Sequence, residues 1–385
     1  MPLLPETNLR ARRALLKTLA GGAAALALPQ LRAQTPPLRI GQSIALTGPL
    51  ADVGQAMHEG GKVCFSAFNA RGGVNGQQIE LVARDDAYQV PRAVGNVEAF
   101  IAEPSIFGLF TCMGTPMVAA TLPQVKQSGI PYFTPLTGAM QARPADMRNV
   151  FNVRASYPQE AEELIKHLFT IGLRKIAVVY QNNAFGKEVF YGANKALTER
   201  SLSTFAVATV ESDASDVSTA ITKIADAAPE AVLIGLAGKP ALQFIQGVRK
   251  ARRSLQLYTT SVMGAASTIS ALGNDAVGLT LTQVVPSPTG TLVPIVRDFQ
   301  QDWKASGTRL EPSHIALEGY INARVFIEAL RRTGRPMSRN AFMDAAWGLR
   351  NVDLGGYRIN ARMPGTSASD FVELTMISRD GRFIR

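Results

Sequence analysis

Cysteine and histidine are scarce in this sequence of 385 residues, which contains two cysteines and three histidines. None of His58, His167 and His314 has a Cys, Asp or His partner at the spacing of metal ligands, so we expect no metal and no other cofactor. Cys64 falls in an apolar helical stripe and is interpreted as a buried side chain, although export would permit a disulfide with Cys112.

Glycine-rich phosphate motifs are also missing. No G-x-G-x-x-G or G-x-x-x-x-G-K-[ST] occurs, and the stretch LTGPLADVG at Leu46–Gly54 lacks that glycine spacing. Pro49 removes one more amide donor from this turn. The sequence therefore disfavours a nucleotide site. Cys112, at the end of a strand pattern, is the one candidate nucleophile, and no base can be identified for it.

Long apolar runs that could span a bilayer, which takes about 20 residues, are absent after residue 33. Basic residues from Arg10 to Lys17 precede a short apolar run, Leu19–Leu28, and Ala33 stands before a candidate cleavage site. This pattern predicts an export signal over residues 1–33 and a periplasmic mature protein. Arg12-Arg13 resembles the twin-arginine signal, with the Sec route as the alternative.

Concentrated basic patches are absent, although the net charge is +10. The densest clusters, Lys250–Arg253 and Arg331–Arg332, each end a helical pattern, where cations complement the helix dipole. We therefore expect no nucleic-acid partner, and we expect a monomer.

What the sequence does contain is a regular alternation of strand and helix patterns from Leu38 onward. Apolar runs lie at 40–46, 79–83, 106–110 and 130–133, with helical patterns between them at 56–69, 90–102 and 116–126. The alternation begins again near Tyr157, and after Val285 come two long helices, a shorter one and two strand-like segments. This order predicts an α/β protein with two doubly wound parallel sheets, each covered by helices on both faces.

Turns rich in glycine and threonine follow the predicted strands. They lie at 47–49, 111–116 and 134–139 in the first half, and at 181–186, 236–240 and 261–265 in the second. Ligands of open parallel sheets bind outside the carboxyl ends of the strands. Backbone amides and hydroxyls between apolar walls suit a small solute with one polar or anionic end.

At these turns the sequence resembles the periplasmic solute-binding proteins of branched-chain amino-acid-type ABC transporters. The resemblance rests on LTGPLADVG, NARGGVNGQQIELVARDDAY, GTPMVAATLPQVKQSGIPYFTPLTGA, FNVRASY, VVYQNNAFGKE and EGYINA. It implies the type I periplasmic-binding fold, in which two Rossmann-like lobes joined by three crossovers close on a ligand. We expect lobe 1 at residues 38–154 plus 286–355, and lobe 2 at residues 155–285 plus 356–385.

The resemblance also implies a ligand site between the lobes. In such proteins the loops after the third and fourth strands hold a carboxylate. Here those loops offer the hydroxyls of Thr115 and Thr137 and nearby amides, at the positive end of the helix that follows. The full predicted set of ligand-binding residues is Thr47, Cys112, Met113, Gly114, Thr115, Leu136, Thr137, Gly138, Tyr157, Phe185, Gly238, Val262 and Met263.

The second lobe departs from the amino-acid-binding pattern. Where amino-acid binders carry an acidic residue for the ligand's ammonium, this sequence has Val262, and a buried ammonium without a counter-ion is costly. Of the aromatic clamp positions only Phe185 keeps a ring, and the others carry Val53 and Gly238. We therefore predict a small organic solute, a carboxylate or a neutral polar compound with an apolar body. Glu318 is interpreted as structural, and whether it reaches the cleft is left open.

These features predict an extracytoplasmic solute receptor that delivers its ligand to a membrane ABC permease and is not an enzyme. Two alternatives stay open. The same closure could signal to a membrane receptor, as in a periplasmic sensing module, or the protein could be a secreted α/β hydrolase that uses Cys112.

Overall fold

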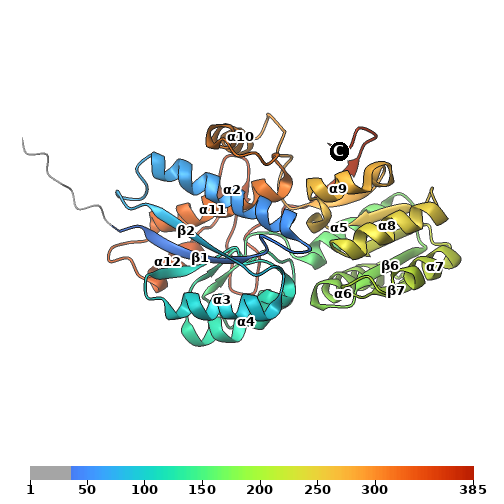
Figure 1. Ribbon diagram of the computed structural model, residues 1–385, viewed down its shortest axis with the longest axis horizontal. Helices are drawn as coiled ribbons and strands as arrows, with labels where there is room; N and C mark the ends of the chain where they lie inside the picture. Colours follow the sequence, from blue (N-terminus) through green and yellow to red (C-terminus); the bar gives the residue numbers. More distant parts are fainter. Residues whose placement is uncertain (1–35) are drawn as a thin grey trace, which may run out of the picture. The chain divides into compact units, whose positions relative to one another are not determined.

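The structure, a computed structural model, describes residues 36–385. The predicted export signal, at residues 1–33, lies outside the described residues. Residues 37–385 cluster as one unit that contains two separate large sheets, each flanked by helices (Figure 1). The sheets are parallel in their central strands, which confirms the predicted α/β fold class.

The first sheet has the order β2-β1-β3-β4-β5, and all of its strands run parallel. Its strands are β1 (Leu38–Ile44), β2 (Ile79–Asp85), β3 (Ile106–Phe110), β4 (Tyr132–Phe133) and β5 (Val150–Phe151). Successive side chains of a strand face opposite layers. Phe110 therefore packs with the layer of α2 (Ala51–Ala70), α10 (Pro294–Ser306), α11 (His314–Arg332) and α12 (Arg339–Trp347), whereas Leu109 packs with that of α3 (Val90–Ala102) and α4 (Thr115–Ser128).

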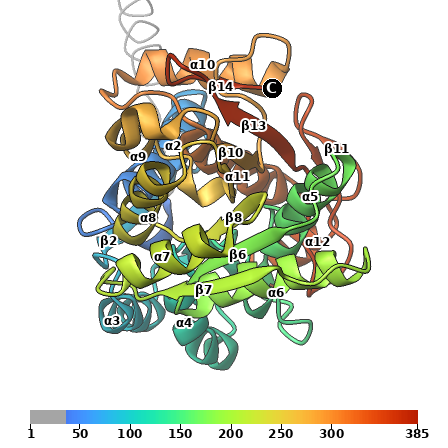
Figure 2. The same ribbon diagram turned by 90° about the vertical axis from the view of Figure 1, so that its right-hand side faces the viewer.

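The second sheet has the order β14-β13-β10-β9-β8-β6-β7. Its strands are β6 (Ile176–Gln181), β7 (Ala206–Val210), β8 (Ala231–Gly235), β9 (Gln256–Thr259), β10 (Thr280–Gln283), β13 (Glu373–Ile377) and β14 (Phe383–Ile384). The strands β13 and β14 are antiparallel additions to a parallel sheet. One face is covered by α5 (Tyr157–Thr170) and α6 (Ala184–Thr198), and the other by α7 (Val217–Ala227), α8 (Lys239–Ala251) and α9 (Ala266–Leu272), as Figure 2 shows.

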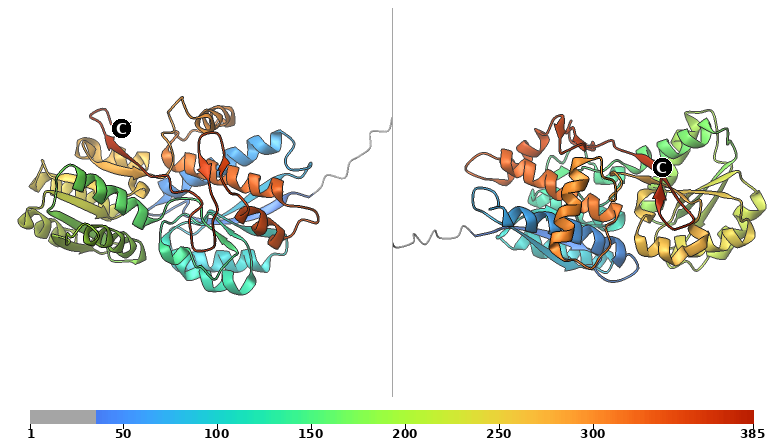
Figure 3. Two further views of the ribbon diagram at one scale, coloured as in Figure 1. Left: turned by 180° about the vertical axis from the view of Figure 1, so that it is seen from behind. Right: turned by 90° about the horizontal axis from the view of Figure 1, so that it is seen from above.

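The chain passes between the two sheets three times. It leaves the first sheet after β5, returns after β10 to build α10, α11 and α12 against the first core, and leaves again before β13 (Figure 3). The small sheet of β11 (Val352–Asp353) and β12 (Arg358–Ile359) stays with that first core, as does Ala368. We call the first sheet with its helices lobe 1 and the second lobe 2; their predicted residue boundaries stay a prediction.

Local capping explains where several helices begin. Ser156 and Gln159 form a reciprocal capping box at the start of α5, which directly follows the first passage between the lobes. The side chains of Asn183 and Ser313 accept hydrogen bonds from backbone amides at the starts of α6 and α11. Each cap satisfies an amide that the helix itself leaves without a partner. The C-terminal strands form a hairpin with Gly381 in the left-handed region, as the turn signal there predicts.

The helices α2 and α11 approach one another through glycine. A Cβ atom on Gly60 would lie 1.9 Å from the carbonyl oxygen of Ala316, and one on Gly319 would lie 2.2 Å from that of Met57. Both clashes are with backbone, which cannot move aside as a side chain would. No helix in the described part of the chain combines the length and apolarity that a membrane crossing requires.

His314, the first residue of α11, is buried against the ring of Phe383, and its Nε2 has no hydrogen-bond partner within residues 36–385. Burial, with a smaller effect of Arg385, lowers the pKa of His314 to about 4. The unfolded chain therefore takes up a proton at a higher pH than the folded protein does. The free energy of unfolding is therefore unaffected by protonation of His314 above the pKa that this histidine has in the unfolded chain. It decreases as the pH falls from that value toward 4.

We expect the free energy of unfolding to fall by about 1 kcal/mol between pH 7 and pH 5.5 on account of this histidine. Urea unfolding at the two pH values measures the effect. His314→Leu should reduce the difference, whereas His167→Leu, at a partly exposed position, should preserve it. An unchanged difference in His314→Leu would assign the acid sensitivity to other groups.

Candidate functional site

A cavity lies where the carboxyl ends of strands from both sheets meet. It is lined by Leu50, Val53, Tyr88, Met113, Gly114, Thr115, Leu136, Tyr157, Phe185, Ala237 and Val262. Its volume is about 30 Å³, so the cavity is narrow. An organic solute therefore requires the two walls to separate before it can enter.

Contacts across the cavity hold its walls together. Asp52 at the start of α2 accepts hydrogen bonds from the hydroxyls of Ser267 and Thr268 in α9. Elsewhere between the lobes, the amide of Met140 donates to Oε2 of Glu188 over 3.2 Å. These bonds join lobe 1 to lobe 2, so the structure represents the lobes in contact.

The structure brings together seven of the residues predicted from the sequence. Met113, Gly114, Thr115, Leu136, Tyr157, Phe185 and Val262 all line the cavity. Leu50, Val53, Tyr88 and Ala237 also line it but are missing from the predicted set, although Val53 was noted as a clamp position. Ala237 lies in a turn that the sequence marks and Leu50 directly follows one, whereas Tyr88 follows β2 without a glycine or threonine signal.

Six predicted residues do not line the cavity. Thr47 is exposed and donates to Asp85 Oδ2 over 2.5 Å, and Met263 is buried in the core of lobe 2. Cys112 belongs to the core of lobe 1. The other three, Thr137, Gly138 and Gly238, stand directly behind lining residues, as the next contacts show.

The polar end of the cavity is built at the start of α4. The hydroxyls of Thr115 and Thr137 are 2.7 Å apart and share a hydrogen bond, and Thr137 Oγ1 accepts from the amide of Ala139. A Cβ on Gly114 would lie 2.8 Å from the ring of Tyr88, and this glycine adopts a φ of 97°. Glycine therefore allows the ring to approach the backbone. A helix N-terminus with nearby hydroxyls favours an anionic or hydrogen-bond-accepting group.

The remainder of the wall is apolar. The rings of Tyr157 and Phe185 meet edge to face with centroids 5.2 Å apart. A Cβ on Gly138 would lie 2.5 Å from the Tyr157 ring, and one on Gly238 would lie 3.1 Å from Leu50. These two glycines shape the cavity from behind. No charged side chain is among the residues that line it.

Glu318 does not line the cavity, which answers the question that the sequence leaves open. It is buried between the lobes, with Oε1 3.6 Å from Arg154 Nη1. Arg154 also pairs with Glu160 over 3.0 Å, and Glu160 Oε2 accepts from the amide of Ser261. Burial raises the pKa of Glu318 above its ordinary value, and the charge of Arg154 opposes this rise. The Arg154–Glu160–Glu318 cluster is therefore a structural link between the lobes.

Comparison with known proteins agrees with this architecture. The family model described as "Periplasmic binding protein" matches residues 37–382. The chain belongs to the periplasmic binding protein family. Its fold is that of the type I members associated with ABC transporters.

Three similar proteins place this periplasmic binding protein among its relatives. A substrate-binding periplasmic protein from Ralstonia solanacearum is 31% identical, with a TM-score of 0.84 over 90% of this chain and 99% of that one. "Leu/Ile/Val-binding protein homolog 7" from Brucella abortus is 23% identical over 80% of this chain and 81% of its own. An R. palustris solute-binding protein in complex with benzoate shares the fold, with 19% identity and a TM-score of 0.80 over 90% of this chain and 95% of that one. All three are described as proteins that bind substrates or solutes.

The two cysteines of this binding protein are free thiols, and both are buried. The structure therefore contains no disulfide between Cys64 and Cys112. Cys112 Sγ accepts from the amide of Ser43 over 3.4 Å, and burial raises the pKa of the Cys112 thiol to about 12. Since the thiolate is the nucleophile, the buried position argues against the hydrolase alternative.

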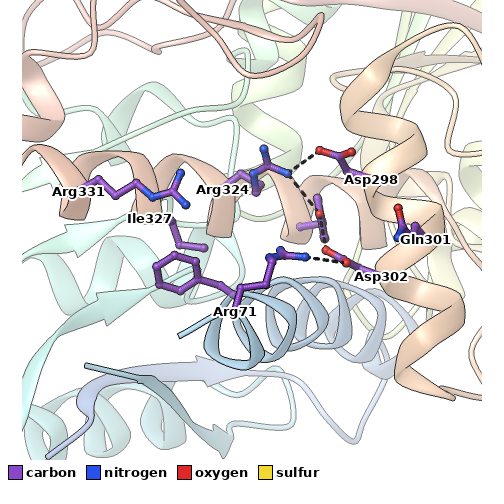
Figure 4. A pocket seen from close by; sticks show the side chains of 9 residues that line it. Arg71, Asp298, Gln301, Asp302, Arg324, Ile327 and Arg331 are labelled. Carbon is purple, nitrogen blue, oxygen red and sulfur yellow. Dashed lines mark hydrogen bonds and ion pairs between the residues drawn. The ribbon is translucent and has the colours of Figure 1, made fainter. Parts of the chain in front are cut away.

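A second, polar pocket lies on the outer side of lobe 1, among α2, α10 and α11 (Figure 4). Its carboxylates are already paired: Asp302 with Arg71 over 3.3 Å, and Asp298 with Arg324 over 3.0 Å. Arg331 lies over the ring of Phe68, 5.4 Å from its centroid. Four of the five charged side chains that line it are paired, so we interpret this pocket as a surface ion-pair network that joins three helices.

Proposed function

We propose that this periplasmic binding protein captures a small organic acid, or a neutral polar compound with an apolar body, and delivers it to an ABC-type permease. One feature of the cavity supports this proposal above all: hydroxyls and the N-terminus of α4 form one end, and no charged side chain lines the remainder. A carboxylate can accept hydrogen bonds at the polar end while its apolar body packs against Tyr157, Phe185 and Val262.

The same cavity disfavours a zwitterionic amino acid. An ammonium group beside Val262 would have no carboxylate to pair with among the lining residues, and Glu318, the acidic candidate that the sequence raises, is paired with Arg154. An unpaired buried charge is strongly unfavourable. The benzoate bound by the R. palustris relative is in keeping with an aromatic acid as a ligand class, although that relative shares only the fold with this chain.

Entry and release require the lobes to separate and close again. We propose that the turn between β5 and α5, around Arg154–Tyr157, is part of the hinge, and that ligand shifts the population toward the closed form that a permease recognises. We also propose that residues 1–33 direct export to the periplasm, where such a receptor can meet its solute.

Calorimetric titration of the purified protein tests the ligand class. We expect no tight binding of leucine, isoleucine, valine or phenylalanine, and we expect a binder among benzoate, phenylacetate, hexanoate and octanoate. At about 100 times its dissociation constant such a ligand stabilises the folded protein by about 2.7 kcal/mol, which thermal unfolding detects independently. Micromolar affinity for leucine together with no binding of any acid would overturn the proposal.

A further inference from the structure

The loop after β2 has an unusual backbone. Ala87 and Tyr88 are consecutive non-glycine residues with φ of 48° and 59°, which place both in the left-handed region. Residues with a Cβ rarely adopt this conformation, and it persists only where the surrounding structure imposes it. Such strain is concentrated at functional sites, where it holds a side chain in place for binding or chemistry.

Two carboxylates impose this conformation. Asp85 Oδ1 accepts from the amides of Leu46 and Ala87, each over 2.9 Å, and Asp86 Oδ1 accepts from the amide of Tyr88 over 2.9 Å. Asp86 is in turn held by the hydroxyl of Ser43 over 2.8 Å. Although burial opposes the shift, hydrogen bonds from Thr47 and from backbone amides lower the pKa of Asp85 to about 2, so it stays ionised. The loop is thereby fixed to β1.

The fixed loop directs the ring of Tyr88 into the ligand cavity. The ring lies over Gly114, where a Cβ would be 2.8 Å from Tyr88 Cε2, and it shares the cavity wall with Thr115 and Tyr157. No hydrogen bond joins the Tyr88 hydroxyl to another group within residues 36–385, whereas the hydroxyls of Thr115 and Thr137 bond to one another. Tyr88 lines the cavity and is partly exposed, so its phenol is free to donate to a ligand.

We propose that Tyr88 is a specificity-determining residue of this site, whose hydroxyl donates a hydrogen bond to the carboxylate of the ligand and so selects acids over their uncharged analogues. The inference rests on the proposed function and names the group that recognises its ligand class. A hydrogen bond from a neutral hydroxyl to a carboxylate is about twice as strong as one to a neutral acceptor. Burial, with the neighbouring Tyr157, also raises the pKa of Tyr88, so the phenol remains protonated and able to donate.

The test compares acids with their amides in the wild-type protein and in Tyr88→Phe, which keeps the ring and removes the hydroxyl. Calorimetry with benzoate and benzamide, and with octanoate and octanamide, gives the acid-to-amide affinity ratio for each body. We expect Tyr88→Phe to weaken acid binding by about tenfold or more and to affect the amides much less. The ratio should therefore fall.

Tyr180→Phe is the matched control, because Tyr180 stacks on Phe190 in lobe 2 and does not line the cavity. It should leave both affinities unchanged. If Tyr88→Phe weakens acids and amides equally, or weakens neither, the ring is only a wall and the inference is wrong while the proposed function stands. If the wild-type protein binds neither the acids nor the amides, the proposed ligand class is wrong and the inference falls with it. If it binds the amides alone, the inference is wrong while the proposed function stands.

Discussion

Replacing Arg154 by alanine is expected to lower the free energy of unfolding by about 3–5 kcal/mol, because the substitution leaves two buried carboxylates without their counter-ion. Arg154 is 3% exposed and pairs with Glu160 of α5 and with Glu318 of α11. It also donates to the hydroxyl of Ser261 over 2.5 Å. One guanidinium thus joins the turn between the lobes to a helix of each lobe. Urea unfolding followed by far-ultraviolet circular dichroism measures the loss.

Two further variants test this explanation. Arg148→Ala removes an exposed arginine that pairs with the exposed Asp344, and it should change stability by less than about 0.5 kcal/mol. Adding Glu318→Gln to Arg154→Ala removes one of the two carboxylates left unpaired, so the double variant should recover part of the loss. If the double variant is less stable than Arg154→Ala alone, the loss arises from packing and not from unpaired charge.

Gly60→Val is expected to destabilise the protein by about 3 kcal/mol, since α2 and α11 cannot keep their separation around an added side chain. The first atom of that side chain would lie 1.9 Å from the carbonyl oxygen of Ala316. Relief requires the two helices to move apart, and these helices form much of the larger hydrophobic core of lobe 1. The midpoint of urea unfolding should fall accordingly.

Gly95→Val provides the matched control for this prediction. Gly95 is exposed in the middle of α3, and a Cβ there would meet no atom within 4 Å. The same substitution should therefore change stability by less than about 0.5 kcal/mol. Equal losses in the two variants would show that the effect belongs to the glycine-to-valine change itself and not to the helix contact.

Local patterns in the sequence were sufficient for most of the secondary structure. The predicted helix at 116–126 corresponds to α4 at Thr115–Ser128, because its apolar spacing and the left-handed Gly129 are both local signals. The start of α2 was predicted five residues late, at residue 56 instead of Ala51. Its first turn has no side-chain cap, and a Cβ on Gly54 would lie 1.9 Å from the carbonyl oxygen of Ala45. That start depends on packing against β1, which local patterns do not encode.

The residues of the candidate site also fall into those that the sequence could place and those that it could not. Turns at the carboxyl ends of parallel strands must gather at one edge of each sheet, so Gly114, Thr115 and Leu136 could be placed from the order of elements alone. Tyr88 was not placed, because the loop after β2 has no glycine or threonine signal and its two aspartates do not show where the ring points. Only the hydrogen bonds of Asp85 and Asp86 turn its ring toward the cavity.

The sequence by itself determined the alternation of strands and helices, the two parallel sheets and the turns from which a ligand site is built, since each depends on residues close together in the chain. The tertiary structure alone decided how the charges are partnered. Glu318 and Arg154 are more than 160 residues apart in the chain, and only the folded structure shows that they form an ion pair between the lobes. The partner of a buried charge depends on distances of a few ångströms, because electrostatic attraction is strong only at short range. The free-energy cost of removing each charge from water must also be offset by an adjacent opposite charge.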